Sequence, residues 1–307
     1  VLPMYLLIGI WGSSGEVRPR GIFGWAFRET GVGTKEYAAM KLTLYLLFGS
    51  AFILVGIFAL YYGTGSGSFS FLELEAASVT PRTQFWVFLA FYVGFGILAG
   101  IWPLHTWSRD GHASAPTAVS MLHAGVLMKL GAYGVVRLGM GLLPEGAADL
   151  AWLVGGVACI NVVYGALSAM AQVDLKYVIA YSSVSHMGVG MLGAATLTQN
   201  GLNGSVFQMF AHGIMTGLFF ALVGLIYEKA HSREIFKMGG FGTMMPGIAV
   251  AFTIGGLSSL GLPATAGFVA EFLTFLGTWS SDYRWWLFPA VLGAFLTSIY
   301  VLRVVRQ

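Results

Sequence analysis

Runs of about 20 apolar residues recur along the whole 307-residue chain, and they limit its fold more than any other feature. Each run is long enough to cross a bilayer as an α-helix, and no long stretch alternates apolar and polar residues as a barrel strand does. Only 9% of the residues are charged, against about 25% in soluble domains. The sequence therefore predicts an all-α, polytopic transmembrane helix bundle.

The apolar runs and their breaks give the expected helices. They lie near residues 1–12, 40–63, 84–101, 117–142, 150–171, 177–197, 202–227, 246–278 and 285–305. The chain begins without Met, and "VLPMYLLIGIWG" resembles the second half of a helix rather than a signal peptide. We therefore expect the sequence to be a piece of a longer protein.

Two apolar regions are interrupted by proline and glycine at membrane depth: "GIWPLHTWSRDGHASAPT" and "SSLGLPATAGFVAE". Such backbone is tolerated in a bilayer only where it is buried in protein or lines a polar cavity. One break in each half is typical of inverted repeats whose discontinuous helices form an ion site. We expect one membrane domain, with 1–142 in the first repeat and 150–307 in the second.

The basic residues support this helix count, because Lys and Arg collect on the cytoplasmic side of membrane proteins. Alternating the loops puts twelve of them on one face: Arg18, Arg20, Arg28, Lys35, Lys41, Arg109, Lys176, Lys229, Arg233, Lys237, Arg303 and Arg306. Three fall on the other face: Arg82, Arg137 and Arg284. Lys129 alone fits neither face, and Glu271 is the only carboxylate deep in a span.

The ionisable residues expected inside the membrane are Lys129, Glu271, His123, His186 and His212. A charge at the bilayer centre costs about 2.5 to 3.5 kcal/mol, so such residues usually face the protein interior and have a function. Burial disfavours the charged form of lysine and of carboxylate, so both can exchange protons near neutral pH. This set therefore predicts a proton relay.

Structural explanations remain open for each of these residues. Lys129 and Glu271 could be paired with an opposite charge or with backbone groups, and the histidines could be packing residues. His123 and Lys129 are separated by about 9 Å and roughly 240° on an ideal helix, so a bridging group is expected between them. Tyr133 follows Lys129 by one turn and is expected to share its face.

Other chemistry has no support in the sequence. The single cysteine, Cys159, excludes a disulfide framework or a Cys-ligated metal site. Phosphate-binding loops, Ser-His-Asp patterns and HExxH are missing, and the dispersed basic residues argue against nucleic acid. We expect no metal and no cofactor; haem ligation by His186 or His212 stays open without positive support.

Several segments together resemble one superfamily. They are "PLHTW", "HASAPTAVSMLHAGVLMKLGAYG", "DLKYVIAYSSVSHMG", "FAHG", "KMGGFG" and "GLPATAGFVAEFLTF". In order and spacing they resemble the antiporter-like proton-translocating subunits of respiratory complex I, Mrp antiporters and membrane-bound hydrogenases. Glu271 stands where the L and N types and the Mrp D subunit carry lysine and the M type, or subunit 4, carries glutamate. The chain thus resembles the M type from its fifth to about its thirteenth helix.

The resemblance implies a role for each matching position. Lys129 would connect two half-channels, His186 and His212 would link the water chain, and Glu271 would release protons outward. No redox site is implied, because quinone reduction elsewhere in an NADH:quinone oxidoreductase would drive this translocase subunit. The implied surroundings are L- and N-type neighbours and lipid, in a bacterial inner membrane.

Departures from the family pattern leave alternatives open. The family's fifth-helix glutamate would lie three positions before Val1, and its partner lysine is replaced by Leu98. His123 is closer to the L type, the 13–38 loop looks long, and the accessory candidates are His105, Tyr133 and Lys176. A relay rerouted through His123 or His105, a non-pumping structural subunit, and a subunit of an Mrp-type antiporter or hydrogenase all remain alternatives.

Overall fold

The computed structural model describes residues 1–14 and 33–306. In that part of the chain all regular secondary structure is helical, and seven helices are long and apolar enough to cross a membrane. The predicted all-α membrane fold is confirmed. Arg18, Arg20, Arg28 and most of the 13–38 loop lie outside the described residues.

The first half contains α1 (Leu2–Trp11), α3 (Lys35–Thr64), α4 (Phe71–Ala76), α5 (Pro81–Ala99) and α6 (Thr106–Ser114). One continuous helix follows, which we call the rod. It consists of α7 (Thr117–Leu122), the π-helix η1 (His123–Leu127), α8 (Met128–Gly134) and the π-helix η2 (Val135–Met140). The second half contains α9 (Pro144–Met170), α10 (Leu175–Ala195), α11 (Gln199–Ala230), η3 (Ile235–Lys237), α12 (Phe241–Met244), α13 (Pro246–Ser259), α14 (Ala266–Trp279), η4 (Arg284–Trp286) and α15 (Leu287–Arg306).

Several helices begin earlier than the apolar pattern predicted. The side chains of Thr34, Thr80 and Thr198 each accept a hydrogen bond from a backbone N–H of the following helix. Pro144 occupies the first turn of α9. Capping favours polar residues and proline in the first turn of a helix. Such residues do not extend the apolar run from which the start of the helix was predicted. The predicted starts at 40, 84, 150 and 202 were therefore a few residues late.

Both predicted helix breaks are present. One separates α5 from α6 and the other separates α13 from α14, with Gly100 and Gly261 in the left-handed region at φ 77° and 65°. Asn161 of α9 holds the first break: its Oδ1 accepts from the Trp102 N–H at 2.6 Å, and its Nδ2 donates to the Gly100 carbonyl at 3.4 Å. The amide thus satisfies backbone groups that a helix would pair internally. The inverted relation of the two halves stays a prediction.

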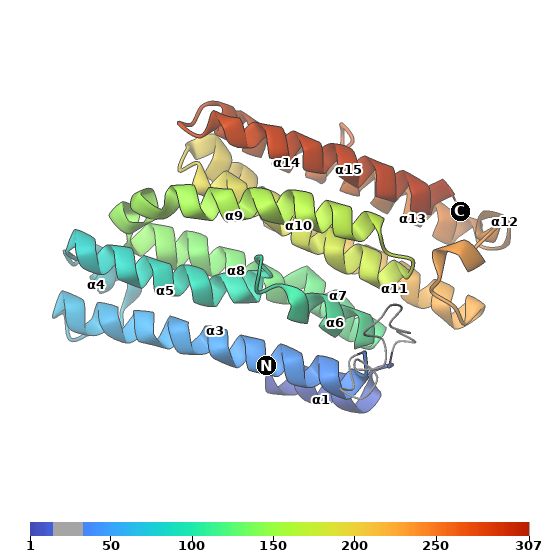
Figure 1. Cartoon of the computed structure of the whole chain (residues 1–307), viewed down its shortest axis with the longest axis horizontal. Helices are drawn as coiled ribbons and strands as arrows, with labels where there is room; N and C mark the ends of the chain where they lie inside the picture. Colours follow the sequence, from blue (N-terminus) through green and yellow to red (C-terminus); the bar gives the residue numbers. More distant parts are fainter. Residues whose placement is uncertain (15–32, 307) are drawn as a thin grey trace, which may run out of the picture.

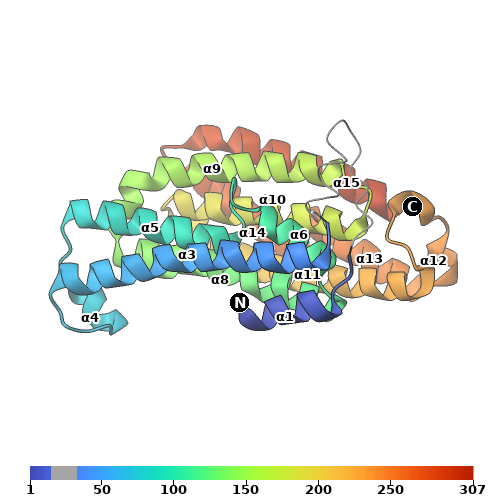
Figure 2. The ribbon, with the colours of Figure 1, turned by 60° about the horizontal axis from the view of Figure 1, so that its bottom comes forward.

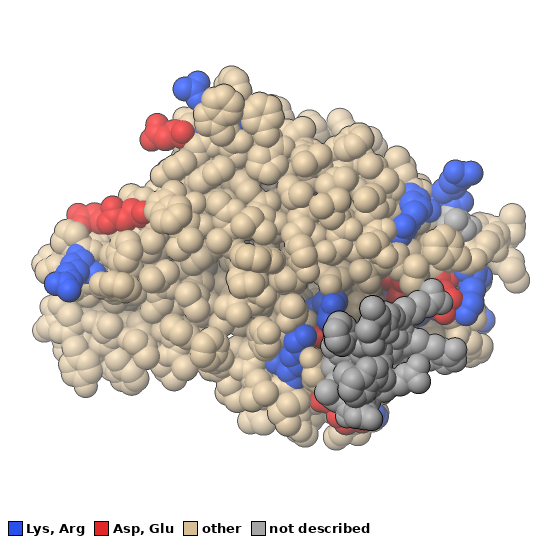
Figure 3. Space-filling model, viewed as in Figure 1, with Lys and Arg blue, Asp and Glu red and all other residues tan. Residues whose placement is uncertain are grey.

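The long helices lie roughly side by side along the long axis of the molecule (Figures 1 and 2). In Figure 1, α3 forms one edge and α15 the opposite edge, with α9, α10 and α11 between them. The span of α10 is entirely buried inside the chain, whereas that of α3 is mostly exposed. On the face shown in Figure 3, charged side chains lie toward the two ends with a broad uncharged surface between them. This distribution fits a membrane-spanning bundle.

We expect Asn161→Leu to destabilise the bundle. The change keeps a similar volume but leaves the Trp102 N–H without its acceptor, and an unsatisfied buried donor costs about 1 to 3 kcal/mol. Thermal unfolding of the detergent-solubilised protein should begin at a lower temperature. The matched change Asn203→Leu, at an exposed position of α11, should leave that temperature nearly unchanged; equal shifts for both variants would contradict the role given to Asn161.

Candidate functional site: a buried row of ionisable residues

The second half of the predicted relay is assembled around His186 of α10. Its Nδ1 lies 3.7 Å from Oε1 of Glu271, and its Nε2 lies 3.2 Å from the Ser259 hydroxyl. The ring of His212, on α11, is centred 5.3 Å from the ring of His186. Three helices therefore bring two imidazoles and a carboxylate into one buried group.

Glu271 lies at the second helix break. It is the sixth residue of α14 and is only 8% exposed. A Cβ at Gly261 would lie 2.6 Å from its Oε2, and Gly261 has a φ of 65°. Glycine is therefore required at this position both for its backbone conformation and for the close approach of the carboxylate. The break provides the space that the acid occupies.

Lys129 lies between the two halves of the chain. Its Nζ donates a hydrogen bond to the carbonyl of Ala124, the residue after His123. A Cβ on Gly213, the residue after His212, would lie 3.8 Å from the Lys129 Cε. The amine thus reaches back along its own rod toward His123 while its stem packs on α11 beside His212. These two contacts place Lys129 beside the residues that carry both imidazoles.

The rod that carries Lys129 has two π-helical segments that the sequence did not predict. They are η1, which begins at His123, and η2, which begins at Val135. π-helical turns are rare and frequently occur at functional sites. Apolar periodicity does not distinguish them from an α-helix, so the expected separation of His123 and Lys129 on an ideal helix does not describe this rod.

His112 is not among the relay or accessory residues that the sequence predicted. It is fully buried on α6, and its ring is centred 4.1 Å from that of His123. Trp107 stacks on His123 at 5.1 Å and Phe220 stacks on His112 at 5.1 Å. Four rings from three segments therefore form one buried stack. The only sequence signal was the presence of a second histidine after the break.

The accessory candidates differ in their placement. Lys176, at the start of α10, is buried and donates to the Ala115 carbonyl at 2.7 Å. His105 contacts the rings of Tyr164 and Tyr181 at 5.0 and 6.4 Å. Tyr133 is 56% exposed, so the expectation that it shares the buried face of Lys129 is wrong. Four residues advance a helix by about 40° beyond one turn, which carries Tyr133 onto the outer surface.

Leu98 packs in an apolar cluster formed by α1, α3, α5 and α6. The cluster includes Ile8, Leu42 and Trp107, and Leu127 also packs against it. The Trp107 indole N–H donates to the Ile97 carbonyl at 2.9 Å. Position 98, where the family resemblance implies a lysine, is therefore surrounded by apolar side chains.

Charged groups at one end of the bundle link several helices. Asp110 of α6 accepts from Lys41 of α3 at 2.7 Å and from Arg109 at 2.7 Å. Asp174 lies 3.2 Å from the Arg233 guanidinium. Burial raises the pKa of the Asp174 carboxyl above its usual range, and Arg233 opposes that rise. These contacts gather residues that the loop count had assigned to one side of the membrane.

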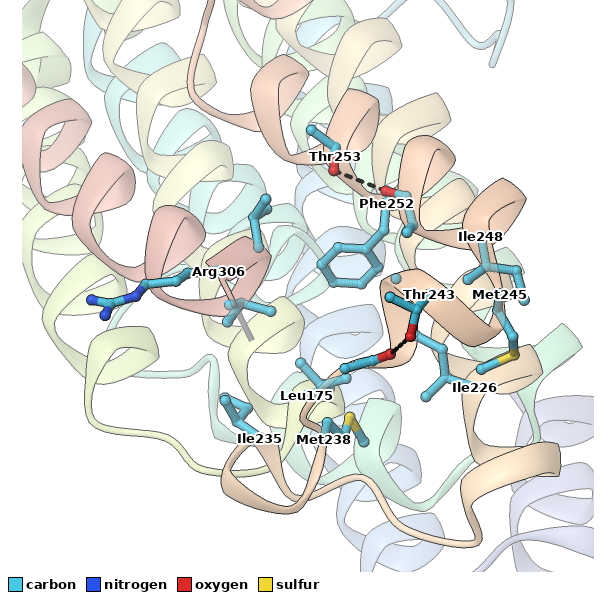
Figure 4. A pocket seen from close by; sticks show the side chains of 15 residues that line it. Leu175, Ile226, Ile235, Met238, Thr243, Met245, Ile248, Phe252, Thr253 and Arg306 are labelled. Atoms are coloured by element: carbon cyan, nitrogen blue, oxygen red, sulfur yellow. Dashed lines mark hydrogen bonds between the residues drawn. The ribbon is translucent and has the colours of Figure 1, made fainter.

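A cavity of about 440 Å³ lies at this end between α10, α11, α13 and α15. Its lining is mostly apolar, and in Figure 4 the Arg306 guanidinium points away from Phe252 and Thr243. Among the described residues that line it, none belongs to the buried row of Lys129, His212, His186 and Glu271. The cavity is therefore separate from the candidate site.

These features define a polytopic membrane protein with two broken helices and an ionisable row between them, an architecture typical of ion-translocating proteins. Residues 29–297 match the family described as "NADH:quinone oxidoreductase/Mrp antiporter, TM". The chain belongs to this family.

Named relatives agree with this result. The chain is 39% identical to NAD(P)H-quinone oxidoreductase chain 4 1 of Synechococcus sp. (strain JA-3-3Ab), covering 100% of this chain and 56% of that protein. It is 37% identical to NADH-quinone oxidoreductase subunit M of Rhodobacter capsulatus, covering 100% and 58%. The predicted M-type, or subunit 4, assignment is confirmed. The chain spans little more than half the length of these relatives.

The fold also matches a solved structure. Superposition on a chain of respiratory complex I from Thermus thermophilus with bound NADH gives a TM-score of 0.89 at 30% identity. The match covers 99% of this chain and 61% of that one. The helix arrangement described above is therefore that of a complex I membrane subunit.

We expect Gly261→Ala to disturb the second break. The added Cβ would meet the Glu271 carboxylate in a left-handed backbone conformation, which costs about 1 to 3 kcal/mol. The detergent-solubilised protein should unfold at a lower temperature than the parent. Gly247→Ala on α13, where a Cβ has open space, provides the control, and a loss of stability in that variant alone would disprove this account of Gly261.

Proposed function

We propose that this chain moves protons across the membrane as an M-type membrane-arm subunit of a complex I-like NADH:quinone oxidoreductase. The observation that carries the proposal is the buried row that connects Lys129, between the two halves, to Glu271 at the second helix break through His212 and His186. Buried ionisable residues inside a membrane bundle generally mark ion or proton pathways. The family membership and the names of the relatives support the same activity.

Each residue of the row has a defined part in this proposal. Lys129 holds a proton at its amine, donating to the Ala124 carbonyl when charged. His212 and His186 hand the proton on, because a neutral imidazole accepts at one nitrogen and donates at the other. Glu271 receives it, with the His186 Nδ1 at 3.7 Å, and releases it outward. The chain itself carries out no redox step; quinone reduction elsewhere in the complex supplies the energy.

The proposal implies an assembly. The partners are other membrane-arm subunits, with L- and N-type neighbours, in an energy-coupling membrane that in bacteria is the inner membrane. Large apolar side chains are exposed along α3, including Leu47, Phe48 and Phe58. Such a surface suits both lipid and neighbouring membrane helices.

We expect Lys129→Met and Glu271→Gln to abolish proton transport by this subunit, because each removes the ionisable group and keeps a similar shape. The measurement is protons moved per electron in vesicles that contain the intact complex and oxidise NADH with quinone. Lys229→Met and Glu228→Gln, at exposed positions of α11, are the matched controls and should behave as the parent.

An unchanged ratio in both buried variants would refute the relay. Sodium-dependent pH changes in vesicles without any quinone substrate would instead identify a cation/proton antiporter subunit. Both measurements use the same preparations, so the two activities can be compared directly.

A non-pumping structural subunit is the second candidate, and the apolar surroundings of Leu98 favour it. Leu98→Lys restores the ionisable group of the family pattern. If the subunit is structural, protons per electron should rise in this variant; if it pumps by another inward route, the ratio should stay constant or fall. Leu127→Lys, introduced into the same apolar cluster, controls for the disturbance caused by a new charge.

A further inference from the structure

The stack of Trp107, His123, His112 and Phe220 holds two further histidines, which are not part of the contact between His186 and Glu271. The His112 and His123 rings are tilted by 30° with their centres 4.1 Å apart. Both side chains are fully buried. At this separation the faces of the two rings are in direct contact. The pair is therefore close enough to exchange protons.

The backbone of α6 is shaped to accept His123. A Cβ at Gly111 would lie 3.0 Å from the His123 Cε1 and 3.2 Å from the Leu42 Cδ1. Only glycine at this position lets the imidazole lie against the helix without displacement. The Ser120 hydroxyl also donates to the His112 carbonyl at 3.0 Å. The local sequence thus fixes both rings in the contact.

The ring nitrogens of the pair are available for transfer. Within the described residues, neither nitrogen of His112 or His123 has a hydrogen-bond partner. Buried polar atoms are nearly always satisfied, by protein or by ordered water. An ordinary packing histidine would have a protein partner for at least one nitrogen, so these rings are suited to contact water or a moving proton.

Lysine amines are bound to the backbone close to each histidine of the pair. Lys176 is at the start of α10, and its amine binds the Ala115 carbonyl just after α6. On the other side, the Lys129 amine binds the carbonyl of the residue after His123. The Lys176 amine is therefore bound beside the end of α6 that carries His112, and the Lys129 amine is bound beside His123.

We propose that His112 and His123 form the inward half of the proton path, carrying protons from the end of the bundle near Lys176 to Lys129. This inference rests on the proposed proton-translocating function. It assigns His112, which the sequence did not predict as a site residue, as a proton-carrying residue. It also accounts for Leu98, because the pair stacks on Trp107 of the apolar cluster that holds Leu98 and needs no ionisable group at position 98.

The transfer steps balance without any electron movement. A proton binds one nitrogen of neutral His112, and the proton on its other nitrogen passes to His123, which leaves His112 neutral. His123 repeats the step and delivers one proton to the neutral Lys129 amine, giving the ammonium. Each imidazole then returns to its starting tautomer by rotation or by proton exchange with water.

The test is a double-substitution cycle in vesicles containing the intact complex. His112→Gln and His123→Gln keep polar side chains that cannot carry a proton at neutral pH. Each should slow proton passage through this subunit by about 10²-fold, and the double variant should lose no more than either alone, because residues acting in series are non-additive. His112→Phe and His123→Phe, which keep the ring stack, should give the same losses.

Phe219→Leu is the packing control, since it truncates a neighbouring buried phenylalanine of α11 that contacts Phe252 outside the stack, and its protons per electron should equal the parent's. Unchanged protons per electron in both histidine variants, with loss in Lys129→Met, would overturn this route and leave the proposed function intact. Losses that add in the double variant would also overturn it, because they indicate separate packing effects. An unchanged ratio in Lys129→Met would instead refute the proposed function itself.

Discussion

The structure depends on the need to satisfy every backbone polar group without water inside a bilayer. Helices meet this need internally, so each of the two breaks requires other groups. At the first break the Asn161 amide binds the backbone of Trp102 and Gly100. At the second, Gly261 adopts a left-handed conformation beneath the Glu271 carboxylate. A polar side chain therefore lies at each of the two helix breaks, Asn161 at the first and Glu271 at the second.

The sequence predicted the membrane class, the spans and both breaks, because length, apolarity and proline or glycine interruptions act directly on the backbone. It also identified Lys129 and Glu271 as ionisable residues inside the membrane, because a buried charge is too costly to occur by chance. It did not predict the π-helical turn at His123, whose apolar pattern is the same as that of an α-helix. His112 was missed because its burial depends on contacts with η1 and α11, which are remote in the sequence.

The two sides of Lys129 differ in chemistry. Toward Glu271, His186 lies among polar groups, with the Ser259 hydroxyl at 3.2 Å and the Gln208 amide at 3.4 Å from its ring nitrogens. On the other side, His112 and His123 lie between the rings of Trp107 and Phe220. An aromatic stack excludes bulk water and holds the imidazoles close together. In the proposed path, the inward half is therefore a narrow two-residue segment and the outward half is a hydrogen-bonded group.

This asymmetry has a consequence for the order of proton movements. Like charges placed close together in a buried, low-dielectric setting repel strongly, and the Lys129 amine lies beside His123, which contacts His112. In the proposed path, the histidine pair can therefore hold a proton only while Lys129 is neutral. In this path, Lys129 must pass its proton toward Glu271 before the next proton enters. The charge of a single buried amine then makes the inward and outward halves of the proposed path alternate without a moving gate between them.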